Sequence, residues 1–251
     1  MQRRTLAPLF ARRTVTSFTQ AMRTAADRMA EKWTDLGPDA TLDISAEMTL
    51  ITLDVLALTI FSDGIGGDFE EFRLAMSAYF GAIGRISALD LLGVPALVPR
   101  LGRRHLRRTM AYFEAVIDDI IEARRRRLAT LAEDDVPNDL LTLLLRTLDP
   151  STGQPMSLAE VKSNILTFLS AGHETTANAL TWSIFLPSQS PEWRAQVQAE
   201  ATQELNGPVE GLADRLIVTR AVGAEALRLY PPIAALSRTA EQGDTLGGVE
   251  V

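Results

Sequence analysis

The stretch FLSAGHETTANALTW, Phe168–Trp182, places a glycine, a histidine, a glutamate and two threonines in the middle of a long apolar segment. Its apolar residues recur at helical spacing, and upstream Ser157 and Glu160 form an S-x-x-E capping box. These features predict one long helix over Leu158–Leu186. Pro187 follows and is expected to end that helix early, because proline has no backbone N–H to donate.

Three interpretations account for the polar cluster inside this helix. A zinc hydrolase is suggested by His173 and Glu174, which begin like H-E-x-x-H, but the residue four places after the histidine is alanine and there is no cysteine. A plain core helix would tolerate the polar residues without explaining why they lie together. A local distortion would explain them, because the Thr175 hydroxyl can bond the Ala171 carbonyl while Gly172 leaves a groove open.

The distortion interpretation also points to a chemistry. Glu174 next to Thr175 could form a hydrogen-bonded relay between solvent and a small molecule in the groove. Oxygen activation needs such a relay, because protons must be delivered along a short path in an otherwise dry pocket.

A second motif, VGAEALRLYPP, occupies Val222–Pro232. Glu225 and Arg228 lie one helical turn apart and are therefore expected to pair. Their neighbours are apolar, so we expect a buried pair that needs further polar partners. Taken alone, a pair at this spacing is common in helices.

Composition limits the class of protein. The 251 residues are 46% hydrophobic and carry a net charge of −7, which indicates a globular chain and argues against a general nucleic-acid binder. The basic run Arg124–Arg127 is interpreted as a solvated helix face. The absence of cysteine excludes disulfides and thiolate ligands within the chain. No signal peptide is visible and Met48–Phe61 is too short to cross a bilayer, so we expect a cytoplasmic protein without a membrane segment.

Helical periodicity along most of the sequence predicts a mainly α fold with a small β element at the C-terminal end. Ser190 and Pro191 are expected to start one helix as its N-cap and first residue. The tail containing TLGGVEV alternates weakly and is expected to form short strands. Besides the long helix, the expected helices cover residues 15–33, 43–61, 69–86, 104–131, 140–148, 191–206 and 217–230.

The two motifs together resemble those of the cytochrome P450 family of haem-thiolate monooxygenases. Ala171–Thr176 is similar to the A/G-G-x-D/E-T-T/S oxygen-binding motif of that family. Glu225–Arg228 is similar to its E-x-x-R motif and is followed by the usual Leu229–Pro232. The order and separation of the motifs also fit, and the resemblance covers the whole chain, which implies a cytochrome P450 fold.

The resemblance implies roles for the residues of the first motif. Glu174 and Thr175 are expected to be catalytic, through proton delivery and O2 activation. Ala171 and Gly172 are expected to form the oxygen-binding groove.

Further roles come from the second motif and from two arginines. Glu225 and Arg228 would form a structural pair beneath the haem. Arg238 resembles the arginine that pairs with a haem propionate, and Arg3 lies where family members often place a similar contact. An ordinary surface arginine is the alternative for both.

The chain departs from the family at the iron ligand. That ligand is a cysteine in a Gly-rich loop near the C-terminus, and this chain has no cysteine, so no metal ligand is assigned. The N-terminal strands of the family are also missing. We therefore expect a single partial P450 domain over residues 1–251, truncated at both ends, that alone neither ligates haem natively nor turns over substrate.

The function implied by the resemblance is that of a fragment of a haem-dependent monooxygenase. The intact parent would insert one oxygen atom of O2 into a small apolar organic substrate, with 69–104 roofing the pocket. Its cofactor would be heme b, with electrons from NAD(P)H delivered by a ferredoxin or a flavoprotein reductase. Arg3, Arg4, Arg12 and Arg13 are candidates for docking an acidic partner. The alternative is a non-catalytic degenerate or interaction protein that kept the helical scaffold.

Overall fold

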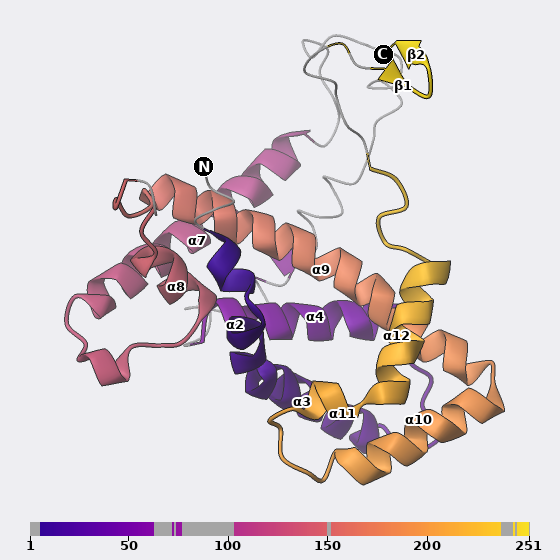
Figure 1. Ribbon diagram of the computed structural model, residues 1–251. Coiled ribbons are helices and arrows are strands. Elements are labelled where there is room, and N and C mark those ends of the chain that lie inside the picture. The colour runs from indigo at the N-terminus through magenta and orange to yellow at the C-terminus, as the bar shows by residue number, and fades with distance from the viewer. Residues whose placement is uncertain are drawn as a thin grey trace.

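The computed structural model is mainly helical, with one small sheet (Figure 1). It describes residues 6–62, 72, 74–76, 103–149, 152–236, 243 and 245–250. The helical elements are η1 (Ala7–Phe10), α2 (Arg12–Ser17), α3 (Thr19–Asp35), α4 (Ile44–Ile60), α7 (Arg103–Leu128), η2 (Glu133–Asp135), α8 (Leu140–Arg146), α9 (Leu158–Ser188), α10 (Pro191–Glu204), α11 (Leu212–Arg215) and α12 (Ile217–Leu229). The strands are β1 (Thr245–Leu246) and β2 (Val249–Glu250).

Most of the helical patterns in the sequence correspond to one of these helices. The pattern over 15–33 is divided at Phe18 between α2 and α3. The helix expected over 69–86 lies outside the described residues, apart from residues 72 and 74–76. In the tail, β1 and β2 pair as an antiparallel hairpin, which confirms the small β element.

Helix α9 is the longest helix described, at 31 residues or about 46 Å. The expected capping box is present, since Ser157 accepts from the Glu160 N–H and the Glu160 carboxylate accepts from the Ser157 N–H. The expectation that Pro187 ends the helix early is wrong, because Pro187 lies buried inside it. A proline in the last turn removes only one ladder donor. The Gln189 N–H then closes the end by donating to the Leu186 carbonyl.

The core is organised around α4, which lies between α3 and α9 (Figure 1). Asp43 begins α4 by accepting from the Ala46 N–H, and the apolar residues that follow are buried on several sides of the helix. One buried cluster joins α4 to α7, α8 and α9, and a second joins α3, α4 and α9. None of the helices described for this chain combines the length and the apolar character needed to cross a membrane.

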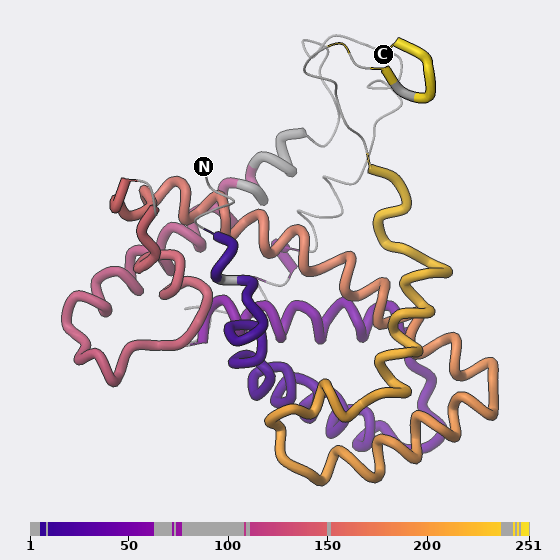
Figure 2. The backbone as a smooth tube through the Cα atoms, in the orientation of Figure 1, coloured from indigo at the N-terminus to yellow at the C-terminus, as the bar shows by residue number. Residues whose placement is uncertain are grey.

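Helices α10 and α12 pack against the C-terminal half of α9. Helix α10 leaves α9 at Ser190, α11 forms a corner, and α12 returns across α9 (Figure 2). Pro191 is the first residue of α10 as expected, but the Ser190 side chain makes no capping hydrogen bond. The Trp182 ring of α9 stacks on Tyr230 at the end of α12, with centroids 3.7 Å apart and planes 5° from parallel. These contacts place the helix of the E-x-x-R motif beside the helix of the AGHETT motif.

Candidate functional site

The polar cluster of α9 lies in an unbroken helix. Thr175 Oγ1 donates to the Ala171 carbonyl at 2.6 Å, which confirms the predicted hydrogen bond. The predicted distortion does not interrupt the helix, which continues through Ala171–Thr176. Ala171 and Glu174 are exposed and Thr175 is half-buried. An alcohol, an acid and a small residue are thus grouped on the accessible side of α9.

The other side of the motif packs into the protein. The His173 side chain is buried. Burial lowers the pKa of His173 below its usual value, and the negative charge of Glu174 opposes this shift only in part. Among the described residues, no group of three or more His, Cys, Asp or Glu side chains could hold a metal ion. The buried His173 is therefore a packing residue on the inner side of α9, and these observations do not support the zinc interpretation.

Gly172 has a packing role that the sequence did not reveal. A Cβ added to Gly172 would lie 3.0 Å from Cδ2 of Leu56 on α4. Real Cβ atoms are rarely this close to another side chain, so a side chain at position 172 would require Leu56 to shift, and glycine permits the present packing of α4 on α9. The sequence could not predict this contact, since nothing near Gly172 indicates which residue of α4 faces it.

We expect Gly172→Ala to lower the free energy of unfolding by about 1–3 kcal/mol, the usual cost of overpacking a core. Urea denaturation of the 251-residue chain would measure this. Gly223→Ala is the matched control, because a Cβ there would meet only Ser183 Oγ at 4.0 Å. That variant should be neutral or up to about 1 kcal/mol more stable, since alanine favours a helix over glycine. Equal losses in the two variants would contradict the packing role.

The E-x-x-R pair forms as predicted. Arg228 donates to both carboxylate oxygens of Glu225, at 2.8 and 2.7 Å. These hydrogen bonds hold the pKa of Glu225 below its usual range. The expected burial is wrong, however, because the Glu225 and Arg228 side chains are 53% and 66% exposed. Their apolar neighbours Leu227 and Leu229 are exposed too, so these residues do not cover the pair.

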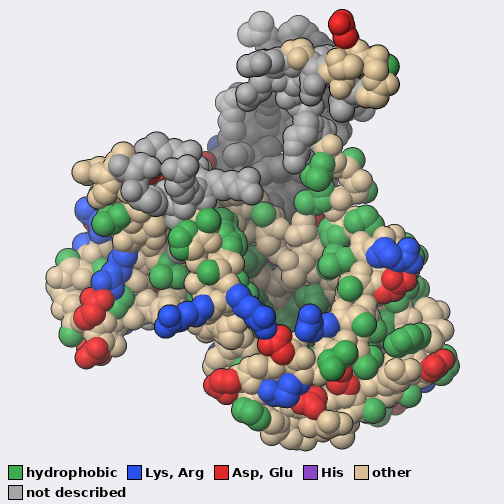
Figure 3. Space-filling view, viewed as in Figure 1, with side chains coloured by type: hydrophobic (Ala, Val, Ile, Leu, Met, Phe, Trp, Pro, Cys, Tyr) green, Lys and Arg blue, Asp and Glu red, His purple; other side chains and the backbone are tan. Residues whose placement is uncertain are grey.

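A pocket of about 380 Å³, open to solvent on one side, lies between helices α9, α10 and α12. It is lined by Leu186, Pro187, Trp193, Ala221, Val222 and Glu225. Apolar side chains remain exposed around this part of the fold, and Figure 3 shows such side chains on one face of the molecule. The exposed large apolar residues of the C-terminal half of α9, of α12 and of the segment 230–236 after it are Leu180, Ile184, Phe185, Ile217, Leu227, Leu229, Tyr230, Ile233 and Leu236.

Among the predicted site residues that the structure describes, the hydrogen bonds join residues of the same motif. The contacts between the two helices include the stack of Trp182 on Tyr230, and Trp182 lies about two turns beyond Thr175. Arg3 and Arg238, the predicted propionate contacts, lie outside the described residues.

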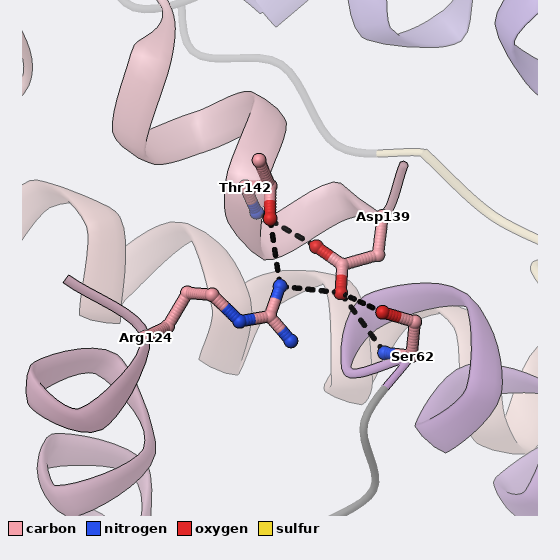
Figure 4. Close-up of polar contacts among 4 residues, drawn as sticks. All are labelled: Ser62, Arg124, Asp139 and Thr142. Atoms are coloured by element: carbon pink, nitrogen blue, oxygen red, sulfur yellow. Dashed lines mark hydrogen bonds and ion pairs between the residues drawn. The ribbon is translucent and has the colours of Figure 1, made fainter. Parts of the chain in front are cut away.

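The sequence did not predict a buried polar cluster around Asp139 (Figure 4). Asp139 accepts from Arg124 Nη1 at 2.6 Å, from the Ser62 N–H at 2.9 Å and from the Ser62 hydroxyl at 2.5 Å. It also caps α8 by accepting from the Thr142 N–H, and Thr142 Oγ1 accepts from Arg124. The cluster therefore ties the end of α4 to α7 and α8.

The electrostatics of the Asp139 cluster favour the ion pair. Burial raises the pKa of Asp139, but hydrogen bonds from Arg124, Ser62 and Thr142 outweigh it, and the pKa lies below its usual value. The interpretation of Arg124–Arg127 as a solvated face is wrong for Arg124, whose side chain is buried. Asp139 directly before a leucine-rich helix was the one signal that could have indicated the cap.

The family follows from these observations together with comparison to known proteins. A long helix with an internal hydroxyl-to-carbonyl bond packs against a helix that carries a bidentate Glu–Arg pair. The sequence profile described as Cytochrome P450 matches residues 1–251. The chain belongs to the cytochrome P450 family.

Individual relatives agree with this assignment. The chain is 33% identical over 250 residues to the cyclooctat-9-en-7-ol 5-monooxygenase of Streptomyces melanosporofaciens, covering 98% of this chain and 52% of that protein. It is 28% identical over 250 residues to a bifunctional cytochrome P450/NADPH–P450 reductase of Bacillus cereus, covering 97% and 23%. The fold matches the crystal structure of the cytochrome P450DA heme domain with a TM-score of 0.82 at 26% identity, covering 99% and 53%. The chain thus spans about half the length of the monooxygenase it matches.

Proposed function

We propose that this chain forms part of a haem-dependent monooxygenase that inserts one oxygen atom of O2 into a small apolar organic substrate. The observation that carries the proposal is the 2.6 Å hydrogen bond from Thr175 Oγ1 to the Ala171 carbonyl inside the motif of a P450-family helix. Membership of that family, and a relative named as a monooxygenase, support an enzyme over the non-catalytic alternative.

The residues present fit one wall of a haem site. On α9, the small Ala171 side chain is exposed on the same side of the helix as Glu174, whereas a side chain at Gly172 would point toward Leu56 of α4. When bound, the haem would supply the redox chemistry that activates O2. The iron-binding thiolate of the family is not supplied by this chain, which has no cysteine. We assign Glu225 and Arg228 to structural support of this site, and Arg3 and Arg238 to the propionates.

We assign proton delivery to Glu174 and Thr175. The Glu174 side chain is exposed and can exchange protons with solvent. The Thr175 hydroxyl gives its only proton to the Ala171 carbonyl, which leaves its oxygen lone pairs available to accept a hydrogen bond. A neighbouring water or bound molecule can therefore be held by Thr175 while Glu174 connects the groove to solvent.

We further propose that electrons from NAD(P)H reach the complete enzyme through a ferredoxin or reductase partner. Support comes from the relative whose name includes an NADPH–P450 reductase. Arg12 and Arg13, two of the arginines considered for docking, are both exposed, and Arg12 Nη2 donates to both carboxylate oxygens of Asp214 at 2.7 and 2.6 Å. Electron transfer that does not change with salt concentration would argue against a basic docking surface.

The experiment that tests the function begins with the coding DNA beyond Val251. An in-frame Phe-x-x-Gly-x-x-x-Cys-x-Gly loop would allow the complete protein to be expressed with its thiolate ligand. That protein, supplied with an apolar substrate, a reductase and ¹⁸O2, should place one labelled oxygen atom in the product. Product that carries oxygen only from water would refute the proposal.

The 251-residue chain alone is expected not to bind haem in the native manner. Titration with hemin, then reduction and addition of CO, should give no thiolate-type absorbance band, because the chain has no cysteine to coordinate iron. The complete protein is the positive control. A thiolate-type band from the chain alone would contradict this expectation.

A further inference from the structure

The helix of the E-x-x-R pair is capped by a residue from another helix. Leu216, the N-cap of α12, has no side chain that could accept from the first turn. Instead Glu200 of α10 accepts from the Val218 N–H at 2.7 Å, the Thr219 N–H at 2.9 Å and the Thr219 hydroxyl at 2.7 Å. The free N–H groups of a helix N-terminus carry partial positive charge, so a carboxylate is the matching partner.

The protonation state of Glu200 agrees with this geometry. Partial burial raises the pKa of Glu200, but the donors of Thr219 and Val218 outweigh that effect, and the pKa lies below its usual value. Glu200 is therefore ionised at neutral pH and binds α12 as an anion.

Helix α10 also holds the segment that leads into α12. Glu204, one turn after Glu200, accepts from Arg215 Nε at 2.8 Å at the end of α11. Two glutamates on one side of α10 thus fix the corner from which α12 starts.

The other end of α12 is fixed by α9. Tyr230, the C-cap of α12, stacks on Trp182, and Trp182 in turn meets Phe185 edge to face at 5.6 Å. Glu225 and Arg228 lie between the Glu200 cap and this stack. Ala226 is the only buried residue of α12, so the contacts at its two ends contribute to where the pair lies relative to α9.

We propose that Glu200 is a positioning residue for the Glu225–Arg228 pair. It sets the start and direction of α12 through the helix N-terminus and thereby the stacking of Tyr230 on Trp182 at the far end. The importance of this positioning for the haem site rests on the proposed function, whereas the positioning itself is a property of this chain.

The test compares Glu200→Gln with Glu192→Gln in the 251-residue chain. Both changes remove one carboxylate from α10, but Glu192 is an exposed residue in the first turn of α10, whereas the hydrogen bonds to the start of α12 come from Glu200. Near-UV circular dichroism detects the stacking of Trp182 on Tyr230. The band due to this stack is the one that is lost in the reference variant Tyr230→Leu. Glu200→Gln should lose most of that band with its far-UV spectrum retained, and its Tm should fall by about 1–8 °C. Glu192→Gln should keep the band.

A full near-UV band in Glu200→Gln would overturn the proposal, even with a lowered Tm, because the cap would then have no effect beyond the first turn. If Glu200→Gln does not fold, Thr219→Val replaces it, since it removes only the hydroxyl contact. Partial loss of the band in Thr219→Val supports positioning, and an undiminished band overturns it. None of these measurements uses haem, so their outcome is independent of whether the complete protein proves to be a monooxygenase.

Discussion

Replacing Asp139 by asparagine is expected to lower the free energy of unfolding by about 3–5 kcal/mol, the range found when one partner of a buried ion pair is removed. The side chains of Arg124 and Asp139 are 5% and 0% exposed and lie 2.6 Å apart. Asparagine has nearly the same shape but no charge, so the buried guanidinium of Arg124 would lose the carboxylate that neutralises it while keeping its hydrogen bond to Thr142. Urea or thermal denaturation of the chain measures the loss.

The control for Asp139→Asn is Asp214→Asn, which breaks the ion pair with Arg12 and a longer, exposed ion pair with Arg220 at 3.8 Å. The pair with Arg12 has the same length, 2.6 Å, but its side chains are 81% and 59% exposed, so the loss should be below about 1 kcal/mol. Similar small losses in both variants would show that burial adds nothing to the Arg124–Asp139 pair.

The pH dependence of Asp139→Asn has a definite sign. Asp139 has a folded-state pKa below that of an unfolded aspartate, about 3.9. Its contribution to stability is therefore fully present above the unfolded pKa and is lost as the pH falls through the lower, folded value. The difference in stability between the wild type and Asp139→Asn should narrow in acid. A difference that widened there would contradict the lowered pKa.

The elements that sequence predicted well are those encoded by neighbouring residues. The Ser157–Glu160 capping box and the bond from Thr175 to Ala171 each join residues within one turn of the same helix, and both are present. Their geometry follows from helix spacing alone. Pro187 was misjudged because a helix penalty for proline depends on position, and the last turn has few bonds left to lose.

The features that sequence missed are those that join distant residues. The Asp139 cluster links Ser62, Arg124 and Asp139 across three segments, and Glu200 reaches α12 from α10. Each of these residues has an ordinary polar sequence context, so their pairing emerges only from how the helices pack.

The misjudged burial of the Glu225–Arg228 pair has a related cause. Helical spacing fixes that the two side chains meet, but the exposure of a pair depends on what lies over the helix. The apolar neighbours in α12 suggested a covered surface, yet those side chains are themselves exposed. The helical spacing therefore predicted the ion pair correctly, whereas the apolar neighbours in the sequence predicted its burial incorrectly.

Replacing Thr175 by valine in the complete, haem-containing protein is expected to slow substrate oxygenation by about 10²–10⁴-fold, the range associated with loss of a positioned acid–base group. Valine keeps the branched shape of threonine but removes the hydroxyl group, which donates a hydrogen bond to the Ala171 carbonyl and whose oxygen can accept one from a neighbouring water or bound molecule. Product formation and O2 consumption, measured together with a saturating reductase, would quantify the effect. Thr175→Ser retains the hydroxyl and should restore much of the rate.

Thr181→Val separates this chemical role from a purely structural one. Thr181 lies on the same helix, and its hydroxyl donates to the Ala177 carbonyl at 2.8 Å, the same i to i−4 bond that Thr175 makes to Ala171. The two valine variants thus remove the same hydrogen bond from α9 and should lose similar stability. Of the two threonines, only Thr175 is next to the exposed Glu174 in the sequence. Equal rates for the two variants would mean that the Thr175 bond serves the helix alone, whereas a selective loss at Thr175 would assign proton delivery to that hydroxyl.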